Sequence, residues 1–270
     1  MERYLKYKIA AHRRSGLIQY AAKLSQRFLN AYHYTGEYEF DSNGEKFAID
    51  KFVQIFGPRA TIWDVGAHLG EYALQAHETM PDSQIISFEI VPEIAEKLKR
   101  KISGDWFSLQ EVGLSDSIGE VDVSWNRNQD TTNSVNPFMY QHIDQSDIQL
   151  RRCPVTTVDQ LVAEGIARPD LLKIDVEGHE KAVLLGARNL LGGSEAPTMI
   201  QFEYGGTWIP SSVTLYSVQT YLESFGYSVG RLYPDHVEFK DYSWYDEHFR
   251  MGNMIATNNE KLRHALANAS

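Results

Sequence analysis

Cysteine is nearly absent from the sequence, which has only Cys153 among its 270 residues. One thiol excludes an internal disulfide framework and any zinc site built on several thiolates. The sequence therefore fits a reducing compartment, and Cys153 is expected to be a packing residue. Long apolar runs are missing too, since no segment approaches the roughly 18 uninterrupted apolar residues of a membrane span. The N-terminal residues also lack the apolar core of a secretory signal, which predicts a cytoplasmic protein.

Positive charge is scarce, because 26 Lys and Arg residues against 36 Asp and Glu residues give a net charge of −10. A phosphate backbone asks for a concentrated basic surface, so we expect no nucleic-acid partner. The charge is also uneven along the chain. Residues 1–30 carry seven basic side chains and one acid, a net of +6, which leaves −16 for the remainder.

The basic N-terminal segment contains one clear amphipathic pattern. Apolar residues recur at helical spacing from Leu17 to Ala31, with Lys23 and Arg27 on other faces. The predicted helix has two interpretations that the sequence does not separate. It packs on the domain with its basic side in solvent, or it docks on an anionic membrane surface or a substrate carrier.

From residue 59 onward, short apolar strands alternate with amphipathic helices. The expected strands cover 61–66, 83–90, 106–114, 169–178 and 197–204, and the expected helices cover 70–78, 92–102, 157–165, 179–191 and 215–225. This alternation is typical of β-α-β units in a doubly wound parallel sheet. Two last strands, 226–234 and 252–258, have no long helix between them, which predicts an antiparallel pair at a sheet edge.

The expected domain organisation follows from where this alternation begins and pauses. Residues 1–58 form an N-terminal helical extension, and residues 59–270 form the α/β domain. A polar insertion at about residues 119–150 interrupts the alternation, opening with an alternating strand and continuing as a loop without an obvious helix.

The turn after the first strand lacks the middle glycine of a dinucleotide-binding motif. It reads DVGAHLG (64–70), so no glycine stands two residues after Gly66. A pyrophosphate needs that glycine for close backbone approach, which disfavours a nicotinamide oxidoreductase. An acid at the strand end suits a cationic or amino-acid-like ligand, and S-adenosylmethionine carries both a sulfonium and an ammonium group. The candidate cofactor-binding residues of the turn are Asp64, Gly66, Ala67, His68 and Gly70.

The next two strands also end in polar residues. Glu89 stands roughly twenty residues past the turn, where its two oxygens can accept hydrogen bonds from both ribose hydroxyls. Ser115 and Asp116 follow the third strand, beside the expected position of the adenine, and Asp116 can accept from the exocyclic amine. A Ser-Asp pair is also ordinary turn chemistry, and Glu89 alternatively is a solvated acid at a strand end.

These segments resemble the FkbM family of S-adenosylmethionine-dependent methyltransferases. The resemblance runs in order from residue 61 to residue 204 through WDVGAHLGEYA, SFEIVPE, VGLSDSIGEV, PVTTVDQL, LLKIDVEGHEKAVLLGARNLL and IQFEY, of which KIDVEG is the most specific part. It implies a class I methyltransferase (Rossmann-like) fold with a seven-stranded, mostly parallel sheet and an antiparallel last strand. It also implies O-methylation of a sugar, polyketide or other secondary-metabolite hydroxyl. The cofactor residues that it implies are Asp64, Gly66, Gly70, Glu89 and Asp116.

The chain departs from the family pattern at two histidines. His68 stands where the family often has asparagine, and His179 follows KIDVEG where a small residue is common. Both departures lie in loops that bear on selectivity, and neither changes the glycines.

The strand end at KIDVEG supplies the candidate catalytic base. Asp175 follows this strand, where ligands bind in open α/β sheets, and Glu203 ends the strand MIQFEY. His179 is a third candidate, because histidine titrates near neutral pH. Methyl transfer to an alcohol needs one base and an aligned acceptor oxygen, and position favours Asp175. Asp175 and Glu203 are also a candidate site for a divalent cation such as Mg²⁺.

Two charged neighbours of this strand are expected to be structural. Lys173 is expected to pair with an acid on a neighbouring element, and Glu180 complements the dipole at a helix start. The acceptor is expected to be a small molecule or a glycan. The polar stretch 130–134 is either its cover or an exposed turn, and the aromatic stretch 242–245 is either a stacking face for a sugar or packing. A non-catalytic S-adenosylmethionine-binding module stays open as the alternative function.

Overall fold

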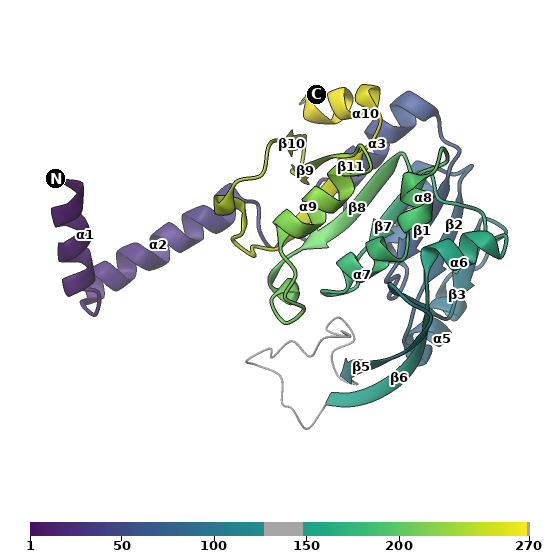
Figure 1. The fold of residues 1–270 in the computed structure, drawn as a ribbon, viewed down its shortest axis with the longest axis horizontal. Helices are drawn as coiled ribbons and strands as arrows, with labels where there is room; N and C mark the ends of the chain where they lie inside the picture. The colour runs from purple at the N-terminus through teal and green to yellow at the C-terminus, as the bar shows by residue number, and fades with distance from the viewer. Residues whose placement is uncertain (127–147, 269–270) are drawn as a thin grey trace.

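The computed structural model of the protein describes residues 1–126 and 148–268 and is built around one large sheet (Figure 1). The strand order of this sheet is β10-β9-β11-β8-β7-β1-β2-β3. Its strands are β1 (Thr61–Val65), β2 (Gln84–Phe88), β3 (Phe107–Gln110), β7 (Leu171–Ile174), β8 (Met199–Tyr204), β9 (Ser228–Leu232), β10 (Val237–Phe239) and β11 (Gly252–Thr257).

Strand directions confirm the predicted mostly parallel sheet with an antiparallel last strand. β1 pairs in parallel with β2 and β7, and the parallel arrangement continues to β3 and β8. β11 is antiparallel to both β8 and β9, between which it lies. The described residues give this sheet eight strands rather than seven, because the three-residue β10 extends its edge. A strand so short shows no periodic pattern in the sequence.

Helices cover both faces of the sheet. They are α3 (Glu45–Phe56), α4 (Glu71–Thr79), α5 (Pro92–Lys101), α6 (Val158–Ala163), α7 (Glu180–Leu185), α8 (Arg188–Gly192), α9 (Leu215–Glu223) and α10 (Glu260–Ala267). One apolar cluster joins α6, α7, α8 and α9 to the sheet, and a second joins α3, α4, α5 and α10 to its other face. Within β1, Trp63 belongs to the first cluster and Ile62 to the second, as the alternation of side chains along a strand requires.

The predicted helix 179–191 is two helices, α7 and α8, with a break at Gly186. A Cβ atom on Gly186 would lie 2.0 Å from the carbonyl oxygen of Ser115. The backbone at Gly186 therefore lies against the backbone of Ser115, at the point where α7 ends and before α8 begins.

The predicted strand 106–114 divides between the large sheet and a second sheet of three strands, β4 (Gly113–Leu114), β5 (Gly119–Asn126) and β6 (Ile148–Thr156). β3 ends at Gln110, and β4 pairs instead with β6, which is antiparallel to β5. β5 is the alternating strand predicted at the start of the insertion. β6 was not predicted, because a proline and two adjacent arginines obscure its alternation. Cys153 of β6 is buried as expected. The polar stretch 130–134 lies outside the described residues.

The N-terminal helices α1 (Glu2–Ala11) and α2 (Gly16–Tyr32) extend away from the sheet (Figure 1). Neither helix has a buried residue, so the interpretation of a helix packed along the domain is wrong. By contrast α3, which belongs to the predicted extension 1–58, buries Ala48, Ile49 and Phe52 against the body. Among the helices of residues 1–126 and 148–268, none combines the length and apolar character that crossing a bilayer requires.

Candidate active site

A cavity of about 280 Å³ opens where the strands β1, β2, β7 and β8 end. Carboxyl ends of parallel strands are the usual ligand position in open α/β sheets. Six of the predicted site residues line it: Gly66, His68, Glu89, Asp175, His179 and Glu203. The five others, Asp64, Ala67, Gly70, Ser115 and Asp116, are not among its lining residues.

The turn at Gly66, which follows β1, contacts the ends of β2 and β7. Gly66 has φ 82°, and a Cβ atom there would lie 1.8 Å from the carbonyl oxygen of Asp175. Only glycine fits this close approach of β1 to the end of β7. The backbone N–H groups of Gly66 and Ala67 both donate to the Phe88 carbonyl at 3.0 Å. Gly70 stands at the start of α4 with φ 76°.

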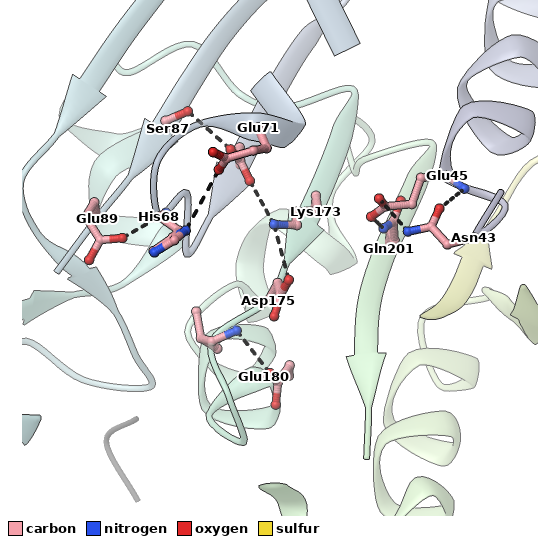
Figure 2. A network of polar contacts seen from close by, with 12 residues as sticks. Asn43, Glu45, His68, Glu71, Ser87, Glu89, Lys173, Asp175, Glu180 and Gln201 are labelled. Carbon is pink, nitrogen blue, oxygen red and sulfur yellow. Dashed lines mark hydrogen bonds and ion pairs between the residues drawn. The ribbon is translucent and has the colours of Figure 1, made fainter. Parts of the chain in front are cut away.

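Glu89 is a buried carboxylate held by two backbone donors. Its Oε2 accepts from the His68 N–H at 2.9 Å (Figure 2), and its Oε1 accepts from the Val91 N–H at 2.8 Å. Burial raises the pKa of Glu89 to about 7, which the two hydrogen bonds oppose and Asp64 reinforces. Each oxygen keeps a lone pair, so the carboxylate can accept two neighbouring hydroxyls.

The backbone of His68 explains how that donor reaches Glu89. His68 has φ 48°, a left-handed conformation in which asparagine, aspartate and histidine are several-fold enriched. This backbone requirement gives a physical reason for asparagine in the family pattern at this position. The histidine of this chain meets the same requirement.

Lys173 lies buried between two aspartates, with Nζ 3.1 Å from Asp64 Oδ1 and 3.5 Å from Asp175 Oδ2. The expectation that Lys173 pairs with an acid is confirmed, and Figure 2 shows the ammonium group directed toward Asp175. Burial opposes its charge, but Asp64, Asp175 and Glu45 together raise the pKa of Lys173 above its ordinary value. Asp64 is fully buried and accepts from Ser87 Oγ at 3.4 Å with its second oxygen. It therefore lies behind the turn rather than in the cavity wall.

The cavity is acidic where β7 and β8 end. Asp175 leaves 42% of its side chain exposed, and Glu177 and Glu203 lie nearby in the wall. Burial, Asp175 and Glu180 raise the pKa of Glu177 to about 8. Burial and the surrounding acids raise the pKa of Glu203 well above its ordinary value. The raised pKa favours the protonated form of each carboxyl group, and a protonated carboxyl group can donate a hydrogen bond to an acceptor oxygen.

Glu180 holds the turn that presents these acids. Its carboxylate accepts from the backbone N–H groups of Val176 at 3.1 Å and Gly178 at 3.1 and 3.2 Å. The side chain is 1% exposed, and burial raises its pKa to about 7. The expected structural role of Glu180 is confirmed, and its contact is with the turn before the helix.

A Glu180→Gln substitution is expected to flatten the pH dependence of stability. A carboxyl whose pKa rises from 4.5 to about 7 on folding stabilises the fold below pH 4.5, and that stability is lost as pH rises toward 7. The wild-type Tm should therefore fall between about pH 5 and pH 8. The Tm of Glu180→Gln should fall less over this range, because glutamine does not titrate. Thermal melts of the exposed Glu111→Gln control should keep the wild-type slope, and equal slopes for all three proteins would contradict the role of Glu180.

His179 connects the acidic end of the cavity to Ser115, which directly follows β4. Its Nε2 lies 3.0 Å from Ser115 Oγ, and burial lowers its pKa, which favours the neutral ring. Ser115 is itself buried and lies 3.3 Å from Asp116 Oδ1, while Asp116 is exposed to solvent. Neither Ser115 nor Asp116 reaches the cavity wall. They are linked to it only indirectly, because Ser115 contacts His179, which does line the cavity.

Sequence reasoning missed two parts of the wall. One is apolar and consists of Ile90, Val91, Ile94, Val112, Leu114, Val123 and Val155. The other is Tyr38, which lies in an irregular segment before α3, where no periodicity marks a functional residue. The aromatic stretch 242–245 is not among the lining residues, and Trp244 and Tyr245 are 70% and 71% exposed.

Among the described residues, no group of three or more His, Cys, Asp or Glu side chains is arranged to hold a metal ion. Asp175 and Glu203 line the same cavity, and the divalent cation considered for them stays a prediction.

The sheet order, the antiparallel last strand and the position of the cavity define a class I methyltransferase fold. The sequence model of the Methyltransferase FkbM domain matches residues 64–229. The chain therefore belongs to the FkbM methyltransferase family.

Three curated proteins illustrate the range of this similarity. AMB antimetabolite synthetase AmbE of Pseudomonas aeruginosa is 30% identical over an alignment of 167 residues that covers 49% of this chain and 8% of that protein. Methyltransferase sdnD of Sordaria araneosa is 25% identical, covering 63% of this chain and 74% of its own. Hexuronic acid methyltransferase AglP of Haloferax volcanii is 26% identical, covering 56% and 59%. The chain thus spans a small fraction of AmbE and well under two thirds of AglP.

A solved structure of methyltransferase FkbM from Methylobacillus flagellatus aligns with 77% of this chain and 47% of its own. The sequence identity is 14% and the TM-score is 0.48.

Proposed function

We propose that the protein transfers a methyl group from S-adenosylmethionine to a hydroxyl oxygen of a sugar, a glycan or a secondary metabolite. The observation that carries this proposal is a single cavity with Glu89 at one strand end and Asp175 at another. Glu89 is suited to binding the ribose of the cofactor, and Asp175 is suited to removing the proton of the acceptor hydroxyl. FkbM membership and the names of sdnD and AglP support methyl transfer, and the choice of a hydroxyl is our own inference.

The residues present fit the cofactor. Glu89 would hold the two ribose hydroxyls, and the apolar wall around Val112 and Leu114 would cover the adenine. Gly66 and His68 would line the path between them, while Asp64 acts through Lys173. When bound, S-adenosylmethionine supplies a methyl carbon activated by the sulfonium group.

The acidic end of the cavity then takes the acceptor. Asp175 receives the hydroxyl proton, and Glu203 and Glu177, in their protonated forms, donate hydrogen bonds that align the acceptor oxygen. The ring of His179 is held by its hydrogen bond with Ser115. His179 therefore forms part of the cavity wall and does not serve as the base. The negative charge of Asp175 would repel a carboxylate on the acceptor. A neutral hydroxyl is therefore favoured over a carboxyl group, such as that of a hexuronic acid, as the methylated group.

Glu89→Gln is expected to weaken S-adenosylhomocysteine binding by at least about tenfold, because hydrogen bonds to a charged group contribute roughly 1.5–3 kcal/mol. The measurement is calorimetric titration, with Glu111→Gln as the matched control. Glu111 directly follows β3, the strand next to β2, but pairs with Lys99 at the surface outside the cavity. Wild-type protein that does not bind S-adenosylhomocysteine would overturn the proposed function. Equal affinities of wild type and Glu89→Gln would overturn the role of Glu89.

The bond formed in the product tests the acceptor chemistry separately. A methyl ether from hydroxyl methylation resists mild alkali, whereas a methyl ester from carboxyl methylation is cleaved. A product that releases its methyl group in mild alkali would contradict the assignment of a hydroxyl acceptor. It would not contradict the proposed cofactor site.

A further inference from the structure

The arm, defined here as residues 1–32 with helices α1 and α2, leaves an unusual amount of apolar surface uncovered. Neither helix buries a residue. Within the described chain, 21 large hydrophobic side chains are exposed, and 11 of them lie on these 32 residues. Contiguous exposed apolar surface marks an interaction site rather than ordinary solvent contact.

The apolar residues of α2 form one continuous face. Leu17, Tyr20, Leu24 and Phe28 follow each other at three- and four-residue spacing and are 77%, 61%, 44% and 69% exposed. Lys23 and Arg27 lie beside this face, and α2 contains no acidic residue. An apolar face rich in aromatic residues with basic residues beside it is the arrangement of helices that lie in a membrane interface.

Charge separates the arm from the rest of the molecule. The arm carries a net charge of +6, while the whole chain carries −10, so the remainder carries −16. An anionic surface therefore attracts the arm and repels the body. This asymmetry fixes which side of the protein meets such a surface.

The arm is attached firmly at its base. The Arg231 guanidinium donates to the His33 carbonyl at 2.9 and 3.2 Å, and Arg250 Nε donates to Asn30 Oδ1 at 3.2 Å. The segment that carries Arg250 also exposes Trp244 and Tyr245, whose rings stack at 3.8 Å. Trp and Tyr are the residues enriched at membrane–water boundaries, and this exposed pair lies in the segment whose Arg250 contacts the base of the arm.

We propose that the arm docks the protein on an anionic phospholipid surface, with the apolar face of α2 in the interface and its basic residues at the head groups. A second copy of the chain is the competing occupant. Two arms would bring like charges together, and the exposed large hydrophobics outside the arm come mostly one at a time from different elements, such as Leu74 of α4 and Leu150 of β6. Neither a second arm nor these single side chains therefore offer a surface that complements the continuous apolar face of α2.

The test is co-sedimentation of the full chain with phosphatidylcholine vesicles that contain either no charged lipid or a fraction of phosphatidylglycerol. We expect binding to the anionic vesicles and at least about tenfold weaker binding for Lys23→Glu/Arg27→Glu, since basic residues near an anionic surface each contribute to attraction. Leu24→Asp should weaken binding through the apolar face. Lys261→Glu, an exposed charge reversal on α10, is the matched control and should bind as wild type.

Each outcome decides the proposal. Wild-type protein that stays in the supernatant with both vesicle types overturns it, as does equal binding of wild type and the Lys23→Glu/Arg27→Glu variant. A wild-type dimer in solution that the arm substitutions dissociate, without vesicle binding, assigns the face to a second copy instead. The arm lies outside the cavity, so S-adenosylhomocysteine titration of each variant reports on folding separately from vesicle binding.

Discussion

Asp175→Asn is expected to lower kcat by about 10²- to 10⁴-fold, the usual contribution of a general base, while S-adenosylhomocysteine affinity changes little. Asparagine keeps the size of the side chain and removes its capacity to accept a proton. Asp175 follows β7 with 42% of its side chain exposed in the cavity, and its backbone N–H donates to the Val65 carbonyl at 2.9 Å. Its backbone position is therefore fixed independently of the carboxylate.

The opposite end of the same strand supplies the control for Asp175. Asp170 precedes β7, and its Oδ2 accepts from the Thr61 N–H at 2.8 Å, far along the strand from the cavity. Asp170→Asn should reduce stability and leave kcat nearly unchanged. Single-turnover kinetics at saturating cofactor separate the two effects, and an Asp175→Asn enzyme within threefold of wild type, on the order of 0.6 kcal/mol in the barrier, would remove Asp175 from the reaction.

Much of the fold was predictable because the strands and helices of the body have strong periodicity. The core strands β1, β2, β7 and β8 lie within the expected ranges, since each is a short apolar run bounded by turn residues. The failures share a physical cause. β10 has three residues, and β6 alternates Cys153 and Val155 with charged neighbours and a proline, so neither element carries enough apolar pattern to be recognised.

The site was predictable where function depends on strand ends. Glu89 and Asp175 follow β2 and β7, and the topology brings such ends to one cavity. Asp64 shows the limit of this reasoning. An acid within a strand can turn into the cavity or away from it, and here Lys173 of the neighbouring strand holds it in the interior. Tyr38 reaches the wall from an irregular segment, a contact made by tertiary structure alone.

The arm shows a different limit. Periodicity identified α2 as amphipathic, but an amphipathic helix looks the same in sequence whether its apolar face meets the domain or another surface. The choice depends on residues outside the helix. The contacts of Arg231 and Arg250 hold only its last residues, so the face from Leu17 to Phe28 stays uncovered.

Lys173→Met is expected to destabilise the protein by about 3–5 kcal/mol, because it leaves the carboxylate of Asp64 buried without its partner. Lys173 is 7% exposed and Asp64 is fully buried, so water does not replace the lost ion pair. Denaturant unfolding of the protein measures the change, with S-adenosylhomocysteine titration as a check on the cavity. A change below about 1 kcal/mol would show that the pair behaves like a surface salt bridge.

A double substitution separates the ion pair from simple packing. Lys173→Met combined with Asp64→Leu removes both charges, and we expect it to be more stable than Lys173→Met alone, because burying an unpaired charge is what costs free energy. The third member of the group, Asp175, is partly exposed, so Asp175→Asn should cost far less stability than Asp64→Asn. That difference would assign the two aspartates separate roles: Asp64 anchors Lys173 in the sheet, and Asp175 is left to meet the acceptor.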